Sequence, residues 1–156
     1  MTASTLIHQY PEKKISLIES PNVNTIGVGE STIGSIKRWT NFLGINDEDF
    51  FRHTDATYKL SIRFENFYKL NDGGFHYPFG QPVIENNRAK FNDWYLKKFL
   101  YPETPNSDYA SCLYPQMALI NNNKLYEEAH KDINFSWNDC VSYQFDATKF
   151  ASFFKK

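Results

Sequence analysis

The most regular alternation of apolar and polar residues runs from Ala56 to Leu70 and predicts a long β-strand. One face of this strand carries Tyr58, Leu60, Ile62 and Phe64, continued by Asn66 and Tyr68. The opposite face carries Lys59, Ser61, Arg63, Glu65 and Phe67, because successive side chains of a strand point to opposite sides. The apolar face is expected in the core, so Lys59 is expected on the other side of the sheet. Spacing alone favours a solvated sheet face for this lysine.

Apolar residues at helical spacing predict helices in several other parts of the chain. These helices are expected over 2–10, 33–43, 90–100 and 109–120 with a break around Pro115, with a short helix after Asn46 and a closing helix after Asp146. Residues 124–130 are expected to form either a short helix or an extended piece. Asn46 and Asp146 are expected to cap the helices that follow them, Ser31 or Thr32 to cap the helix 33–43, and Gly44 to end it. Two further strands are expected, over Lys14–Glu19 and Cys140–Phe145.

The segment Phe75–Gly80 combines three aromatic residues with His76. Pro78 cannot donate a backbone hydrogen bond, so this segment is expected to be a loop or a sheet edge. A compact aromatic loop is suited to form the wall of a site for a planar apolar ligand. The alternative is a hydrophobic plug under a hairpin, and the segment by itself slightly favours the plug.

The N-terminal order of helix, strand, Glu19 and loop is typical of the second half of a dinucleotide-binding βαβ unit. In such a unit an acid at the end of the second strand accepts hydrogen bonds from a ribose hydroxyl, and the glycine fingerprint lies about 20 residues earlier. That fingerprint would precede Met1. Either the unit is not dinucleotide-binding or its first strand is missing, and a lone Glu at a strand end is more often solvated.

The stretch Thr25–Gly34 holds three glycines, one acid and several hydroxyls between the expected strand and the expected helix. Glycine allows a close approach of the backbone to a ligand, and the start of a helix presents unpaired N–H groups. The stretch is therefore a candidate cofactor loop, with a plain tight turn as the equal alternative.

Composition restricts the function classes. The 156 residues are about the length of one domain, and 14 Phe, 10 Tyr and 3 Trp make the chain unusually aromatic. A net charge of -1 without charge blocks argues against a nucleic-acid partner. Cys112 and Cys140 have no paired spacing, so neither a metal site nor a disulfide is expected. Reduced thiols are typical of the cytoplasm, which is the expected location. No membrane span or signal peptide is expected.

Several motifs, in order along nearly the whole chain, resemble those of the flavin-dependent tryptophan halogenases. They are Ile15–Ser20, Gly27–Ile33, Phe42–Ile45, Asp55–Leu60, Tyr77–Gly80 and Tyr143–Ala147. The resemblance implies an α/β fold, α+β within this stretch: part of an FAD-binding Rossmann-like module plus the sheet and helices of a substrate domain. Residues 1–156 are then one incomplete domain, the N-terminal to middle portion of a halogenase fold.

The same resemblance implies an oxidoreductase that uses reduced FAD (FADH2), oxygen and a halide ion to make hypohalous acid. Lys59 matches the catalytic lysine that directs this oxidant, as a haloamine or by a hydrogen bond, to tryptophan or another electron-rich aromatic such as indole. A lysine in a poorly hydrated pocket can have a lowered pKa and act in this way. The residues matched to cofactor binding are Glu19, Gly27, Val28, Gly29, Glu30, Ser31, Thr32 and Ile33. Those matched to substrate binding are His76, Tyr77, Pro78 and Phe79.

The chain departs from the family pattern at several positions. Tyr77 stands where the family often has His, with His76 one position earlier, so a substrate other than tryptophan is an open alternative. Gly34 replaces a common proline and Phe67 a common tryptophan. The N-terminal glycine fingerprint, a Trp-x-Trp-x-Ile-Pro motif and the segment with the catalytic glutamate do not appear.

Two other functions remain open: an inactive remnant or flavin- or aromatic-binding module, and a flavin monooxygenase that hydroxylates. The Lys59 motif argues against the hydroxylase, which has no need of that lysine. The expected partners are a flavin reductase, an aromatic substrate and either a complementing chain or a second copy. Self-association is expected because the predicted Ile15–Ile18 strand would expose an apolar edge.

Overall fold

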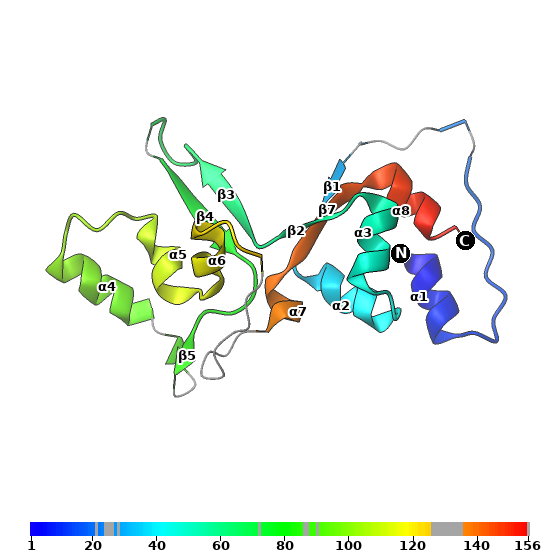
Figure 1. Ribbon diagram of the computed structural model, residues 1–156, viewed down its shortest axis with the longest axis horizontal. Helices are drawn as coiled ribbons and strands as arrows, with labels where there is room; N and C mark the ends of the chain where they lie inside the picture. Colours follow the sequence, from blue (N-terminus) through cyan, green and yellow to red (C-terminus); the bar gives the residue numbers. More distant parts are fainter. Residues whose placement is uncertain are drawn as a thin grey trace. The chain divides into compact units, whose positions relative to one another are not determined.

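The computed structural model describes residues 1–20, 22–23, 27, 29–71, 73–85, 88–89, 91–125 and 136–155 (Figure 1). The chain forms two compact units, Met1–Thr57 with Tyr143–Lys156, and Tyr58–Ser142. It passes between them twice, within β2 (Thr57–Lys59) and at the start of β7 (Ser142–Asp146). The prediction of a single domain over 1–156 stays a prediction.

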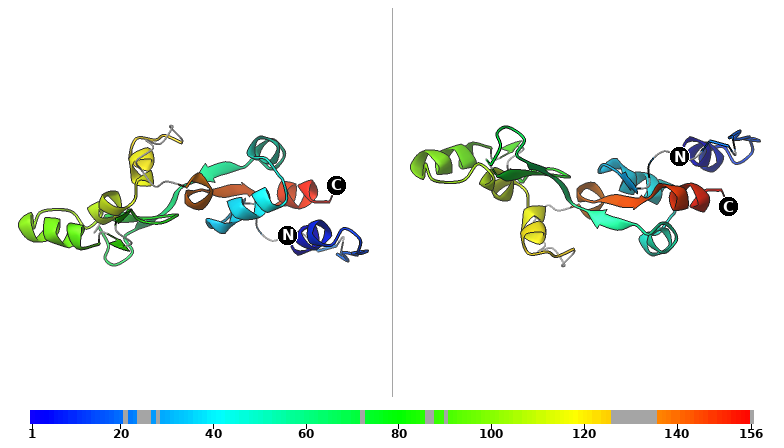
Figure 2. Two further views of the ribbon diagram at one scale, coloured as in Figure 1. Left: turned by 90° about the horizontal axis from the view of Figure 1, so that it is seen from below. Right: turned by 90° about the horizontal axis from the view of Figure 1, so that it is seen from above.

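The first unit is built on β7 and the helices that pack against it. Its other elements are α1 (Thr2–Gln9), β1 (Gly29–Ser31), α2 (Ser35–Phe42), α3 (Asp47–Thr54) and α8 (Ala147–Phe153). β1 pairs antiparallel with β7, with Gly29 opposite Asp146, and the strand order of this sheet is β1-β7-β2. Figure 2 shows α2 and α3 on opposite sides of β7.

An aromatic cluster centred on Phe50 of α3 forms the core of the first unit. Phe50 is fully buried, and its ring centroid lies 5.3 Å from that of Tyr143 and 5.8 Å from that of Phe145. Phe150 and Phe153 of α8 contact the same ring edge to face, at 6.1 and 5.8 Å. These rings explain why α3, β7 and α8 pack together although α3 and α8 are far apart in the sequence.

Local capping chemistry sets the helix ends as the sequence predicts. The Asn46 side chain accepts a hydrogen bond from the Asp49 N–H at 2.8 Å, and the Asp146 side chain accepts one from the Lys149 N–H at 2.8 Å. Gly44 follows the last residues of α2 with a φ of +70°, a left-handed conformation that glycine adopts readily. The predicted caps at Asn46 and Asp146 and the stop at Gly44 are confirmed.

The second unit contains a β-hairpin and short helices. β3 (Ser61–Glu65) and β4 (Gly74–Pro78) pair antiparallel, with Ser61 opposite Pro78. β5 (Ile84–Glu85) pairs with β6 (Arg88–Ala89). The helices are α4 (Phe91–Leu100), α5 (Asp108–Leu113), α6 (Gln116–Asn121) and α7 (Trp137–Cys140). The predicted break at Pro115 is confirmed, because this residue precedes α6.

Two strand predictions are wrong. Residues 14–20 form no strand, and Leu17 and Ile18 are 70% and 95% exposed, because an isolated strand without a neighbour is not stable in water. The long strand expected over Ala56–Leu70 is split between β2 and β3 and ends at Glu65, since Asn66 has a φ of +50°. The prediction of a loop or a sheet edge over Phe75–Gly80 is confirmed as a sheet edge, because 74–78 form β4 in a two-stranded sheet.

The helix after the glycine-rich stretch begins later than expected. Ser31 belongs to β1, α2 starts at Ser35, and Gly34 occupies the N-cap position, so the predicted cap at Ser31 or Thr32 is wrong. The Thr32 hydroxyl is used for a different hydrogen bond, described below. Residues 124–130, expected to form a short helix or an extended piece, lie largely outside the described residues. Within the described ranges, no helix combines the length and the apolar character needed to cross a membrane.

Candidate functional site

Lys59, at the end of β2, is half-buried against an aromatic ring of the second unit. Its Nζ lies 5.2 Å from the ring centroid of Phe79, which is only 6% exposed. A cation over an aromatic face favours the charged amine. Burial has the opposite effect, because it removes water from the ammonium, and it prevails: the pKa of Lys59 lies below the usual range of a lysine. The result is an amine that loses its proton more readily than a solvated one.

The main chain of Phe79 is held on both sides. Its N–H donates to the carbonyl of Leu60, the residue after Lys59, at 3.0 Å. Its carbonyl accepts a hydrogen bond from Nε2 of Gln116, a fully buried residue at the start of α6. These two hydrogen bonds to the main chain of Phe79 therefore fix its position next to Lys59.

Gly80 ends this segment in a conformation that only glycine adopts without strain. Its φ is +89°, and a Cβ there would lie 2.5 Å from Sγ of Cys140. Cys140 is buried, and burial raises the pKa of its thiol to about 11. This cysteine therefore packs as a protonated apolar residue rather than as a nucleophile.

The hairpin separates the other predicted substrate residues onto two faces. His76 lies opposite Arg63 in the register, and its Nδ1 is 2.8 Å from Oγ of Ser61. Burial and the nearby Arg63 lower the pKa of His76, while Glu65 acts in the opposite direction. Tyr77 pairs with Ile62 on the alternate face and is 61% exposed.

Of the predicted substrate residues, Phe79 is the one whose side chain lies next to the Lys59 amine among the contacts described above. Pro78 is buried and pairs with Ser61, the first residue of β3 after the Lys59–Leu60 step.

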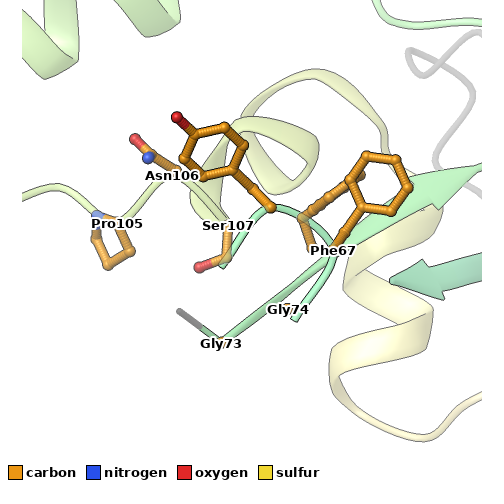
Figure 3. A pocket seen from close by; sticks show the side chains of 8 residues that line it. Phe67, Gly73, Gly74, Pro105, Asn106 and Ser107 are labelled. Carbon is orange, nitrogen blue, oxygen red and sulfur yellow. The ribbon is translucent and has the colours of Figure 1, made fainter. Parts of the chain in front are cut away.

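A hollow of about 450 Å³ lies at the other end of the hairpin (Figure 3). Aromatic side chains of Phe67, Tyr68 and Phe75 line it, together with the loop 105–107. Gly74, on its rim, pairs with Glu65, four residues along the strand from Ser61, which corresponds to about 13 Å at the usual rise per residue. This hollow is separate from the contact between Lys59 and Phe79.

In the first unit the glycine-rich stretch is an exposed strap, which pairs with β7 through Gly29–Ser31 and is bonded to it again at Thr32. Gly27 has a φ of +94°, Gly29 and Glu30 are exposed in β1, and Ile33 is 64% exposed. Thr32 anchors the strap: its N–H and its hydroxyl both donate to the Tyr143 carbonyl at 2.9 Å, and its hydroxyl accepts from the Tyr143 N–H at 3.0 Å. Val28 lies outside the described residues.

A buried ion pair supports this anchor, and the sequence analysis did not predict it. Nζ of Lys37, in α2, lies 2.6 Å from Oδ1 of Asp47, and the Tyr143 hydroxyl donates to the same oxygen at 2.6 Å. Lys37 is 8% exposed and Tyr143 is fully buried. Tyr143 therefore joins the strap, through Thr32, to the ion pair between α2 and α3.

The strap also borders a hollow of about 480 Å³ within the first unit. Ser31, Thr32 and Ile33 line it on the strap side, and Ile36 and Trp39 of α2 line it on the other. Glu19 is exposed and forms an ion pair with Lys155. Among the residues that the structure describes, no group of three or more His, Cys, Asp and Glu side chains is arranged to hold a metal ion.

The sequence analysis also missed Gln116, Ser61 and the contact between Gly80 and Cys140. The only signal for Gln116 was a polar residue at the start of the apolar run Met117–Ile120. Ser61 was placed on the same face as Lys59, but its hydrogen bond to His76 depends on the hairpin register.

Comparisons with known proteins agree on one family. The family model described as tryptophan halogenase matches residues 1–156. Tryptophan 6-halogenase ThaL of Streptomyces albogriseolus is 27% identical over 158 residues, which cover 91% of this chain and 28% of ThaL. The chain therefore spans less than a third of that curated relative.

Solved structures show the same similarity over the whole chain. The apo structure of VirX1 matches with a TM-score of 0.85 and 34% identity, covering 99% of this chain and 30% of VirX1. BrvH, a flavin-dependent halogenase from Brevundimonas sp. BAL3, matches with a TM-score of 0.73 and 27% identity, covering 99% of this chain and 30% of BrvH. These neighbours, together with the mixture of helices and strands, confirm the α/β fold class.

Proposed function

The chain belongs to the tryptophan halogenase family, and from this membership we propose that it is part of a flavin-dependent halogenase acting on an electron-rich aromatic compound. Tryptophan and indole are the first candidates for the substrate. The observation that supports the proposal best is the half-buried Lys59 amine against the Phe79 ring, with its pKa lowered by burial. A hydroxylating monooxygenase would have no use for such an amine.

Reduced FAD with oxygen and a halide supplies hypohalous acid in this kind of reaction. The strap fits contact with a flavin, because Ser31, Thr32 and Ile33 line a hollow whose volume lies in the range of ligand pockets, roughly 300–1,000 Å³. We assign Glu19, Gly27, Val28, Gly29, Glu30, Ser31, Thr32 and Ile33 to flavin contacts.

Lys59 is proposed to deliver the halogen. In one role, the neutral amine takes the halogen cation from hypohalous acid to form a haloamine, and the remaining hydroxide accepts one amine proton and leaves as water. In the other role, the amine donates a hydrogen bond to the intact hypohalous acid. Both roles need an amine that is unprotonated or nearly so at working pH, and burial beside Phe79 favours that state. Phe79, with His76, Tyr77 and Pro78 of the same segment, is proposed to contact the aromatic substrate, and the 61% exposed ring of Tyr77 offers it a stacking surface.

The test is halogen transfer with the matched segment of ThaL replaced by residues 1–156, assayed with FAD, a flavin reductase, bromide and tryptophan or indole. The expected product has the mass shift of one bromine for hydrogen. Lys59→Ala is expected to abolish it with flavin binding retained, and the exposed control Lys69→Ala is expected to keep it. Product formation by Lys59→Ala at the wild-type rate would refute the assignment, and flavin binding without product in every variant would favour a binding module.

The proposed partners follow from the same chemistry. A flavin reductase supplies FADH2, and a complementing chain or a second copy covers the exposed Leu17 and Ile18. The two free thiols of Cys112 and Cys140 support a reducing cytoplasm as the location. Size-exclusion chromatography of the chain alone tests the association: a stable monomer would contradict it.

A further inference from the structure

The carbonyl of Phe79 lies beyond the hydrogen-bond ladder of the hairpin. β4 ends at Pro78, which pairs with Ser61, so the residue after it has no strand position opposite it in β3. The N–H of Phe79 finds the Leu60 carbonyl, and its own carbonyl is left at a buried position. Buried carbonyls need a donor, and here a side chain supplies it: Nε2 of Gln116.

Gln116 is a polar residue at a fully buried position, where apolar residues are more common. The residue is fully buried at the start of α6, beside the buried Met117 and Leu113. Within the described part of the chain, its Oε1 is buried without a hydrogen-bond partner. A buried amide with an unpaired oxygen is less favourable than an apolar side chain of similar volume. The gain from Gln116 therefore lies in the contact that its Nε2 makes, which an apolar side chain cannot replace.

The segment around Phe79 is also constrained on both sides of this residue. On one side the bond to Leu60 joins it to the residue after Lys59. On the other side Gly80 has a φ of +89° and packs directly against Cys140. Loss of the Gln116 contact would leave the buried carbonyl without this donor, which favours a movement of Phe79 toward another donor.

We propose that Gln116 is a positioning residue, which holds the Phe79 ring against the Lys59 amine and thereby restricts the aromatic substrates that reach this lysine. The part concerning Phe79 and Lys59 stands on the contacts alone. The part concerning substrates rests on the proposed halogenase function. The held ring, only 6% exposed, limits the space beside the amine, so the favoured substrates are flat one- or two-ring aromatics, and release of the ring admits bulkier ones.

The experiment compares Gln116→Met, which keeps the length of the side chain and removes the donor, with Gln144→Met, the same change at an exposed position of β7. A lysine-specific acylating reagent is applied across a pH series, and the modification of Lys59 and of the exposed Lys69 is followed by peptide mass spectrometry. In Gln116→Met the pH midpoint of Lys59 is expected to move up toward that of Lys69, because the shifted ring no longer shields the amine. Gln144→Met is expected to leave it unchanged.

Gln116→Glu supplies a conservative test of the donor. A protonated carboxyl group donates to the Phe79 carbonyl and an ionised one cannot, so this variant is expected to resemble wild type at low pH and Gln116→Met at high pH. A lower melting temperature of Gln116→Met with an unchanged Lys59 midpoint would overturn the proposal, since Gln116 would then be only structural.

Substrate preference is measured separately, in the ThaL replacement. Gln116→Met is expected to raise kcat/KM for a bulkier aromatic relative to indole by several-fold. An unchanged ratio would overturn the part concerning substrates. A shifted Lys59 midpoint without halogenated product in any variant would support the positioning role and count against the proposed function.

Discussion

The two compact units hold their candidate site residues in opposite ways. In the first unit, the strap is exposed and is held by the pairing of β1 with β7 and by hydrogen bonds of the Thr32 hydroxyl and N–H with the main chain of Tyr143, beside a dense aromatic core. In the second unit, Lys59 is half-buried, and its Nζ lies 5.2 Å from the ring centroid of Phe79. The hairpin around them leaves Phe67 and Tyr68 71% and 92% exposed.

This difference suits two kinds of chemistry. An exposed strap of glycines and hydroxyls can lie along a large ligand, while a strong anchor keeps its course fixed. A reactive amine instead gains from removal from water: burial lowers the pKa of Lys59, although the neighbouring aromatic ring favours its charged form. In the proposed function, the first unit is therefore the part that contacts the flavin, and the second unit supplies the environment of the reactive amine.

The largest expected effect on stability distinguishes the aromatic cluster around Phe50 from the aromatic rings of the β3–β4 hairpin, Phe64, Phe67 and Phe75. Phe50→Ala is expected to lower the free energy of unfolding by about 3–5 kcal/mol, because it removes a fully buried ring from the core of the first unit. Phe67→Ala, which removes an exposed ring contacting Phe64 and Phe75, is expected to cost about 1 kcal/mol. Urea denaturation measures both, and equal costs would show that the hairpin aromatics are as well packed as the core.

A second pair of variants separates backbone strain from packing. Gly44→Ala is expected to cost about 1–2 kcal/mol from the left-handed backbone alone, since a Cβ there meets nothing within 4 Å. Gly80→Ala adds a clash with Cys140, and its total cost is expected to be about 2–4 kcal/mol. If thermal unfolding gives the same loss for both, the contact between Gly80 and Cys140 does not constrain the site.

The buried ion pair gives the next effect. Tyr143→Phe is expected to cost about 1.5–3 kcal/mol, because it removes a hydrogen bond to the carboxylate of Asp47 in a buried place. Tyr10→Phe, at a 48% exposed position, is the matched control and is expected to cost almost nothing. Chemical denaturation of the two variants measures the difference. A Tyr143→Phe variant as stable as wild type would mean that the Lys37–Asp47 pair holds α2 and α3 without help.

The smallest expected effect is a dependence of stability on pH through His76. Burial and Arg63 lower the pKa of His76 in the folded state, so the unfolded state binds the proton more tightly. The contribution of His76 is fully present above its unfolded pKa of about 6.5 and is lost as the pH falls through the folded pKa. His76→Gln is expected to flatten the fall in stability between neutral and mildly acidic pH, and an unchanged slope would contradict this.

Local chemistry made part of this fold predictable. Asn46, Asp146 and Gly44 act on neighbouring residues, so their caps and stops could be inferred from sequence. Strands could not be inferred equally well, because a strand exists only with a partner: Lys14–Glu19 has the right pattern and forms none. Asn66 ended the alternating run at a left-handed turn that the pattern did not reveal.

The candidate site was predictable to a similar extent. The family resemblance pointed to Lys59 and Phe79, and the structure places them together. Gln116 could not be inferred in the same way, because its contact with Phe79 joins residues 37 positions apart. The ion pair of Lys37 and Asp47 likewise depends on how α2 and α3 pack, which helical periodicity does not specify.

The central claim is that Lys59 is an amine made reactive by burial beside Phe79. The most direct test is a site-resolved titration of the wild-type chain, in which acylation of Lys59 and Lys69 is followed over a range of pH by peptide mass spectrometry. Lys59 is expected to reach half of its maximal rate at a lower pH than Lys69, because burial lowers the pKa of Lys59. A midpoint of Lys59 equal to or above that of Lys69 would contradict the claim.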